Sequence, residues 1–263
     1  MNIATLPSVD LHWREDGNPD GHPAVFANSL GTDLRLWDTL IPLLPETLRI
    51  IRFDKRGHGL SSNPDGPYQM SDLVSDTEQL LDHLNIRSCL FIGLSIGGMI
   101  GQSLAASRPD LIHALVLSNT AAKMGNKAIW QERIEQINSG GMSPMVETIL
   151  SRWFSPGFLA SNEVIGWRHM LQRTPANGYT GCCHAIATSD LSEQTATLTL
   201  PVMGIAGSVD SASPPELVEA TINSIRGASY HVINGVGHLP CVEKPAEYAA
   251  LLTHFIRETI HDQ

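Results

Sequence analysis

The sequence has 263 residues, 42% of them hydrophobic and 17% charged, and its formal net charge is −10. This composition is typical of a globular protein and excludes an intrinsically disordered chain, and the length allows one large domain with a modest insertion. The negative charge disfavours nucleic acid and anionic membranes as partners, and no apolar stretch approaches the ~20 residues of a membrane-spanning helix.

The beginning of the chain alternates short apolar strands with helices. Apolar runs predict strands at residues 11–15, 23–28 and 48–54. Between the last two strands, apolar side chains recur on one face of a predicted helix: Leu36, Trp37, Leu40 and Leu44. Ser71 is a suitable N-cap for the following helix, which directs Leu73 and Leu80 inward.

Residues 89–101 combine a strand, a turn and a helix around one serine. Four apolar residues lead into Gly93, Ser95 follows, and helical periodicity begins after Gly97. Gly-x-Ser-x-Gly between a strand and a helix is typical of a nucleophile elbow, in which small neighbours allow a sharp turn and the serine hydroxyl stands clear of the chain. An ordinary turn with a solvated serine is the alternative, and the flanking strand and helix favour a catalytic Ser95.

The alternation is interrupted after a further strand at residues 111–117. Residues 122–190 contain short helical patterns separated by glycine and proline, which predict a helical insertion over the carboxyl edge of a sheet. Strands then resume at residues 201–207 and 229–233, with a helix after each.

This order of elements predicts an α/β fold with a mostly parallel sheet that helices cover on both faces. We expect a core formed by residues 1–121 and 191–263 and a helical cap formed by residues 122–190.

A catalytic serine needs a base, because its hydroxyl is a weak nucleophile at neutral pH. Of the eleven histidines, His238 is the best placed, in a glycine-rich turn after the last predicted strand. A carboxylate must orient this base, and Asp210 follows the preceding predicted strand. The competing strand end carries Asn119, which cannot hold the charge. We therefore predict Ser95, Asp210 and His238 as nucleophile, acid and base.

Two main-chain N–H groups are needed to bind the oxyanion that forms during acyl transfer. Ile96, the residue after the nucleophile, is predicted to supply one. Leu30, in the loop after the strand at 23–28, is predicted to supply the other. An ordinary strand-end turn is the alternative interpretation of that loop.

The four cysteines and the N-terminus bear on the compartment. Cys89 falls on a predicted buried strand, and the adjacent Cys182 and Cys183 point different ways in any regular element. We predict free thiols in a reducing compartment. The first ten residues show neither the basic cluster nor the apolar run of a signal peptide, so a cytoplasmic location is expected.

With these residues in place, the chain resembles the α/β-hydrolase family over essentially its full length, and within it the 3-oxoadipate enol-lactonases. The elbow and the turn at residues 54–59 (Asp-Lys-Arg-Gly-His-Gly) are shared by many α/β-hydrolases. The loop at residues 28–32 (Asn-Ser-Leu-Gly-Thr) and residues 181–183 (Gly-Cys-Cys) are more particular to the enol-lactonases.

The resemblance implies an α/β-hydrolase fold and hydrolysis of a small anionic enol-lactone in aromatic compound catabolism, with no metal ion or organic cofactor. The substrate carboxylate needs a cation, and the cap offers four arginines: Arg133, Arg152, Arg168 and Arg173. Trp130 and Arg133 are three residues apart and share a face if they lie on a helix. We expect Trp130, Arg133 and Trp153 to bind the substrate. For the first two, packing and solvation alone are the alternative.

Other activities share this scaffold. A broader carboxylesterase or a carbon–carbon bond hydrolase is the nearest alternative, and a slow-turnover small-molecule receptor is another. Dehalogenases and epoxide hydrolases are disfavoured, because their resemblance would need an aspartate where Ser95 stands. The sequence leaves open the pathway branch and whether the chain forms a homo-oligomer.

Overall fold

The computed structural model describes residues 1–260 of the chain. His261, expected at the end of the final helix, lies outside them. The centre is an eight-stranded sheet in the order β1-β2-β4-β3-β5-β6-β7-β8. In chain order the strands are β1 (Asn2–Thr5), β2 (Asp10–Gly17), β3 (His22–Ala27), β4 (Leu48–Phe53), β5 (Cys89–Leu94), β6 (Ile112–Ser118), β7 (Val202–Gly207) and β8 (Ser229–Ile233).

The pairing of the strands confirms the mostly parallel sheet. β2 pairs antiparallel with β1 and with β4, and the other neighbours pair in parallel. Every residue of β5 and β7 is buried, which explains why the central strands have continuous apolar sequences rather than alternating ones. β1 is a short edge strand that the sequence pattern did not reveal.

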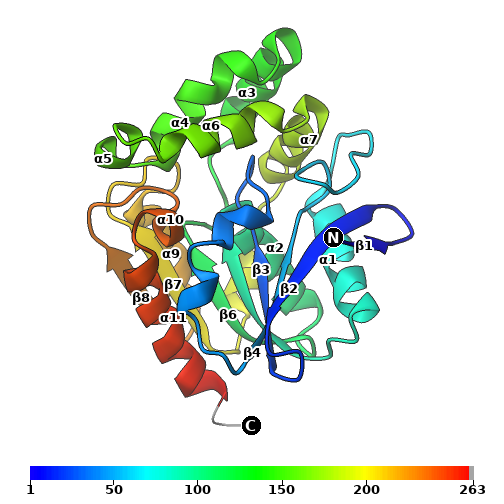
Figure 1. Cartoon of the computed structure of the whole chain (residues 1–263), viewed down its shortest axis with the longest axis vertical. Helices are drawn as coiled ribbons and strands as arrows, with labels where there is room; N and C mark the ends of the chain where they lie inside the picture. Colours follow the sequence, from blue (N-terminus) through cyan, green and yellow to red (C-terminus); the bar gives the residue numbers. More distant parts are fainter. Residues whose placement is uncertain (261–263) are drawn as a thin grey trace.

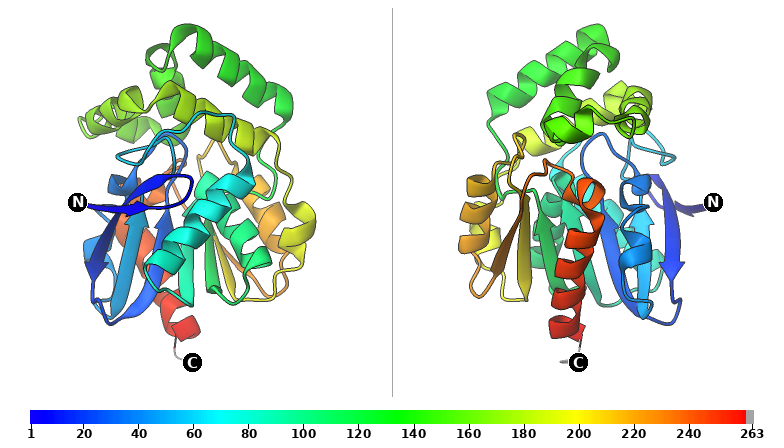
Figure 2. Two further views of the ribbon diagram at one scale, coloured as in Figure 1. Left: turned by 90° about the vertical axis from the view of Figure 1, so that its right-hand side faces the viewer. Right: turned by 60° about the vertical axis from the view of Figure 1, so that its left-hand side comes forward.

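Helices cover both faces of this sheet. Those of the core are α1 (Met70–His83), α2 (Ile96–Ser107), α8 (Ser192–Ala196), α9 (Pro215–Asn223), α10 (Pro240–Glu243) and α11 (Pro245–Ile260). The two views of Figure 2 place α1 and α2 on one face and α11 on the opposite face. None of the helices in residues 1–260 combines the length and the apolar character needed to cross a lipid bilayer.

Further helices between β6 and α8 lie together above one edge of the sheet (Figure 1). They are α3 (Lys127–Gly140), η3 (Ser143–Met145), α4 (Val146–Trp153), α5 (Pro156–Leu159), α6 (Val164–Arg173) and α7 (Ala176–Ala187). Their residues share a cavity with Ser95, which directly follows the end of β5, so the covered edge is the carboxyl edge. The limits of the cap at residues 122 and 190 remain a prediction.

The segment after β3 differs from the predicted helix. It forms two short 3-10 helices, η1 (Leu34–Trp37) and η2 (Ile41–Leu43). Pro42 has no N–H group and its ring collides with the carbonyl of the preceding turn, so an α-helix cannot run through this position. The predicted apolar side chains are nevertheless buried: Leu36, Trp37, Leu40 and Leu44.

The start of α1 also differs from the prediction that Ser71 caps it. The helix begins at Met70, and Gln69 occupies the N-cap position. The Asp72 carboxylate accepts a hydrogen bond from the Gln69 N–H at 2.8 Å. Because this carboxylate already holds the chain entering the helix, Ser71 lies inside the first turn.

The turn between β5 and α2 is crowded on both sides of Ser95. Ser95 has a φ of 59° and a ψ of −121°, a positive-φ conformation that residues other than glycine rarely adopt. A Cβ atom at Gly97 would lie 2.1 Å from the carbonyl oxygen of Ala27, and one at Gly93 would lie 2.3 Å from that of Gly97. The two glycines of the motif are therefore required by the close approach of strand and helix.

We expect Gly97→Ala to lower the free energy of unfolding by about 1–3 kcal/mol or more, because the added methyl group meets rigid backbone. Gly166→Ala is the matched control, since Gly166 is an exposed residue within α6 whose added Cβ would meet nothing within 4 Å. This control should be neutral or stabilising by up to about 1 kcal/mol. Urea denaturation of both variants measures the difference, and equal midpoints would contradict the close approach.

Candidate active site

Ser95 lines a cavity of about 250 Å³ between the core and the cap. Its N–H group donates to the Ser118 carbonyl at 2.9 Å, and Thr120 Oγ1 donates to the Ser95 carbonyl at 2.6 Å. Both partners belong to the end of β6 and the loop after it. These two hydrogen bonds hold the main chain on either side of the serine and so maintain its strained conformation.

His238 and Asp210 lie together at the carboxyl edge of the sheet, near Ser95. His238 also lines the cavity, and its Nδ1 is 2.8 Å from Asp210 Oδ2. A carboxylate can only accept a hydrogen bond, so Nδ1 is the donor and Nε2 is left as the proton acceptor. The structure thus joins the predicted acid to the predicted base and places the predicted nucleophile in the same cavity as the base.

The Asp210 carboxylate is buried and has four hydrogen-bond donors around it. Oδ1 accepts from the N–H groups of Ala212 (2.7 Å) and Ser213 (3.0 Å). Oδ2 accepts from His238 and from Asn119 Nδ2, each at 2.8 Å. These donors satisfy both oxygens and fix the orientation of the carboxylate.

Asn119 therefore takes part in the site, although the sequence interpretation set it aside for lack of charge. Its φ is 47°, and its amide also lies 3.4 Å from the Gly237 carbonyl, beside His238. One signal for this role is visible in the sequence, which is that Asn119 follows a central parallel strand. Its side-chain amide supports the acid instead of replacing it.

The two predicted oxyanion donors come from neighbouring elements. Leu30 lines the cavity. Ile96 is the first residue of α2, and the N–H groups in the first turn of a helix have no partner within that helix. Since β3 pairs with β5 in parallel, the loop that holds Leu30 and the N-terminus of α2 emerge at the same edge of the sheet.

The cavity contains two of the four cap arginines. Arg133 on α3 and Arg152 on α4 line it, and no Asp or Glu does. Burial and the charge of Arg133 lower the pKa of Arg152. Arg168 instead binds Glu147 on the outside of the cap, and Arg173 lines a different cavity.

The predicted aromatic residues lie in the cavity wall. Trp130 donates its indole N–H to the Met124 carbonyl at 2.6 Å, and the Arg133 guanidinium lies 5.1 Å from the centre of its ring. A guanidinium over an indole face is a favourable cation–π arrangement. Tyr179 on α7 also lines the cavity, a position that the sequence interpretation missed.

Trp153 connects the cap to the base. Its side chain lines the cavity, and its carbonyl accepts a hydrogen bond from the His238 N–H at 2.7 Å. Nearby, Glu243 accepts from the Gly237 N–H at 2.7 Å and from the Ser155 N–H at 3.1 Å. The main chain before His238 is therefore bound to both the cap and the core.

The remaining predictions concern thiols and metals. All four cysteines are free and buried, which agrees with the predicted free thiols. Burial raises the pKa of the Cys182 thiol to about 12, so it is not a reactive thiolate at neutral pH. Within residues 1–260, no group of three or more His, Cys, Asp and Glu side chains is arranged to hold a metal ion.

The chain is similar to known hydrolases over nearly its full length. A family model described as alpha/beta hydrolase fold matches residues 23–140. The chain is 35% identical to 3-oxoadipate enol-lactonase 2 of Acinetobacter baylyi, over 93% of this chain and 92% of that protein. It is 31% identical to 3-oxoadipate enol-lactonase 1 of the same organism, over 91% and 90%. The solved enol-lactonase of Burkholderia xenovorans LB400 superposes with a TM-score of 0.94 at 32% identity, over 97% of this chain and 100% of that one.

We expect Asp210→Asn to lower kcat for a nitrophenyl ester by about 10⁴, because an amide no longer holds the His238 ring in the required tautomer. Asn119→Ala should lower kcat far less, since Asp210 keeps three of its four donors. Steady-state kinetics of the two purified variants provide the comparison. The reverse ranking would move the acid to another residue.

Proposed function

The chain belongs to the α/β-hydrolase family, and from this premise we propose that it is a serine hydrolase that opens a carboxylate-bearing enol-lactone, 3-oxoadipate enol-lactone, to 3-oxoadipate. One observation carries the proposal. The cavity that contains Ser95 and His238 also contains two arginines and no acidic residue. The relatives named 3-oxoadipate enol-lactonase support the choice of substrate.

The charge of the cavity favours an anionic substrate. Arg133 and Arg152 are both half-buried, and the ion pairs within residues 1–260 include neither of them. Two cations without an acidic partner repel each other, and an anion between them would relieve this repulsion. A carboxylate can accept two parallel hydrogen bonds from a guanidinium. We assign this role to Arg133, with Trp130 and Trp153 as the adjoining walls.

The proposed reaction begins with acylation of Ser95. Its hydroxyl oxygen attacks the lactone carbonyl carbon while His238 Nε2 accepts the hydroxyl proton. The tetrahedral oxyanion is held by the main-chain N–H groups of Leu30 and Ile96. Asp210 orients His238 and stabilises the imidazolium that forms. The ring carbon–oxygen bond then breaks and expels an enolate.

Release of the product completes the cycle. The enolate is a better leaving group than a simple alkoxide, and it stays attached to the enzyme because the lactone is cyclic. The protonated His238 first gives its proton to the enolate oxygen, which leaves an enol and a neutral imidazole. His238 then takes a proton from a water molecule, which attacks the acyl-enzyme carbonyl. When the bond between the acyl carbon and Ser95 Oγ breaks, His238 returns this proton to Ser95, and a carboxylate is freed. The enol tautomerises to the 3-oxo dicarboxylic acid. Every proton transfer in this sequence uses Ser95, His238 or water, so no cofactor takes part.

The proposal extends to the cellular location of the enzyme, its metabolic role and the function of the cap. We propose that the enzyme acts in the cytoplasm, in the degradation of aromatic compounds, and that residues 122–190 function as the substrate-binding cap. The names of the relatives and the burial of all four thiols are the observations in favour.

We expect Ser95→Ala to fold normally and to lose about 10⁴–10⁶ in kcat, because the reaction loses its nucleophile while the core keeps its packing. Enol-lactone hydrolysis, followed by ultraviolet absorbance on protein whose circular dichroism matches the wild type, measures this loss. Retention of more than about a tenth of the wild-type kcat would contradict nucleophilic catalysis by Ser95.

Arg133→Ala should lower kcat/KM for the enol-lactone by roughly ten- to a hundred-fold, since a hydrogen bond to a charged group contributes about 1.5–3 kcal/mol. A neutral nitrophenyl ester has no carboxylate to bind, so its hydrolysis should change much less. Arg152→Ala, measured on the same two substrates, shows how much the second cation contributes.

Arg168→Ala is the matched control, because Arg168 also belongs to the cap but binds Glu147 outside the cavity. It should leave both substrates unaffected. Equal losses on the lactone and the neutral ester in Arg133→Ala would indicate damage to the cap and would contradict the carboxylate-binding role.

A further inference from the structure

The turn that follows β4 is bound to the loop that carries Leu30. Lys55 is fully buried in this turn, and its Nζ donates to the carbonyl oxygens of Ser29 at 2.7 Å and Thr32 at 3.2 Å. His58 Nε2 lies 3.0 Å from the Gly31 nitrogen and accepts its hydrogen bond. Three hydrogen bonds from one turn thus hold three peptide groups of the loop, two of them adjacent.

The Lys55 contact fixes the direction of a specific N–H group. The carbonyl of Ser29 and the N–H of Leu30 belong to one peptide group, which is planar and trans, so they point in opposite directions. Because Lys55 binds that carbonyl from the side of the β4 turn, the Leu30 N–H is directed away from the turn. Ser29 and Leu30 line the cavity that contains Ser95, and Lys55 does not.

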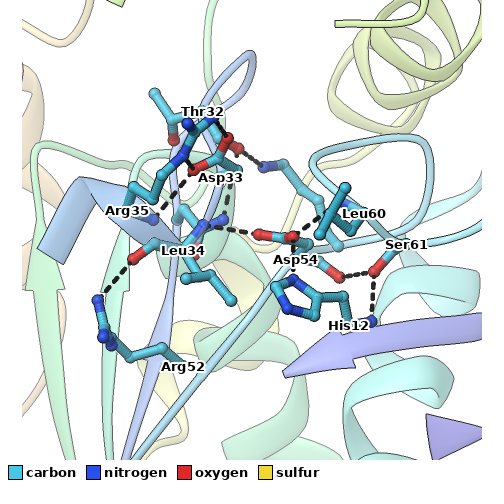
Figure 3. Close-up of polar contacts among 11 residues, drawn as sticks. His12, Thr32, Asp33, Leu34, Arg35, Arg52, Asp54, Leu60 and Ser61 are labelled. Atoms are coloured by element: carbon cyan, nitrogen blue, oxygen red, sulfur yellow. Dashed lines mark hydrogen bonds and ion pairs between the residues drawn. The ribbon is translucent and has the colours of Figure 1, made fainter. Parts of the chain in front are cut away.

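The other contacts of the loop hold its position as a whole. Asp54 Oδ1 accepts from the Leu34 N–H at 2.6 Å, and Arg52 Nη1 donates to the Leu34 carbonyl at 3.0 Å. Figure 3 shows Asp54 between Leu34, Leu60 and His12. These residues restrain the far end of the loop. Within the loop, the Ser29 carbonyl also accepts from Thr32 Oγ1 at 2.9 Å and from the Thr32 N–H at 3.3 Å. Lys55 adds a charged donor to this same carbonyl from the turn after β4.

We propose that Lys55 is a positioning residue for the oxyanion hole, in which its ammonium group holds the Ser29 carbonyl and thereby orients the Leu30 N–H toward the reacting carbonyl. This inference rests on the proposed function of Ser95 and Leu30 and assigns a role to the Asp-Lys-Arg-Gly-His-Gly turn, which the reaction itself does not use. His58 supports the same loop through the next peptide group.

The ionisation of Lys55 gives this role a pH dependence. Burial lowers the pKa of Lys55 to about 8, and the nearby Cys182, Asp54 and Asp33 raise it only partly again. Burial and the charge of Lys55 hold the pKa of His58 well below its usual range, so His58 stays neutral. As pH rises through about 8, Lys55 loses its charge, and its hydrogen bonds to the loop become weaker.

The test is Lys55→Met, which keeps the length of the side chain and removes its donor. We expect kcat for a neutral nitrophenyl ester to fall about ten- to a hundred-fold, less than the roughly 10²–10³ that follows the outright loss of an oxyanion donor. KM should change little, because the oxyanion exists only in the transition state. A kcat within about twofold of the wild type would overturn the proposal.

Arg56→Met is the matched control. Arg56 is the next residue of the turn, but its guanidinium binds Asp76 at 2.6 Å through two nitrogens. With rates normalised to the folded fraction, this variant should keep its kcat. Equal losses in both variants would indicate general damage to the turn and would overturn the role of Lys55. Ser95→Ala distinguishes failure of the proposed function from failure of the role of Lys55. An active Ser95→Ala would contradict the proposed function. An inactive Ser95→Ala together with a normal Lys55→Met would contradict only the role of Lys55.

The pH profile of kcat gives an independent measurement, which also decides the matter if Lys55→Met does not fold. Wild-type kcat should fall as pH rises through about 8, and folded Lys55→Met should lack this alkaline limb. A wild-type kcat that stays level up to about pH 10, or an alkaline limb that persists in the variant, would overturn the proposal.

Discussion

The contact between Gly97 and Ala27 determines the geometry of the whole site. A Cβ atom at Gly97 would lie 2.1 Å from the Ala27 carbonyl oxygen, so the first turn of α2 lies directly against the end of β3. Ser95 precedes this turn and the loop with Leu30 follows β3. One close approach of backbone to backbone therefore brings together the proposed nucleophile and both candidate oxyanion donors. The strained φ of Ser95 is the conformational consequence of that approach.

The charged groups near the site differ in whether the protein itself supplies their partners. The Asp210 carboxylate has four donors, and the Lys55 ammonium has two carbonyl acceptors, so the protein itself supplies hydrogen-bond partners to both. Arg133 and Arg152 are the contrasting case, since they face the cavity and no acidic residue lines it. A protein that leaves cations without acidic partners in a partly buried cavity keeps an unfavourable field there, which an anionic ligand would neutralise.

The sequence was informative where chemistry requires a fixed spacing, and less so where it does not. The elbow, the α/β order and the joining of Asp210 to His238 followed from glycines, apolar runs and strand ends. The helix predicted after β3 was wrong because apolar periodicity does not register the break that Pro42 imposes. The predicted cap of α1 was wrong because the hydrogen bond that holds the helix start joins Gln69 and Asp72. Asn119 was set aside because it carries no charge, and Lys55 lies in a turn that the proposed reaction does not use. Their roles follow from hydrogen bonds to Asp210 and Ser29 that only the fold reveals.

The segment that joins α4 to the core contacts both the cavity and the main chain of His238. The Trp153 carbonyl binds the His238 N–H, and Glu243 binds main-chain N–H groups of both Gly237 and Ser155. Arg152 immediately precedes Trp153 on the same helix. A displacement of α4 would therefore move a cavity cation and the main chain of the base together. Because a base must stand within hydrogen-bond distance of the proton it accepts, the proton transfer that we propose for His238 depends on where α4 and Glu243 hold this segment.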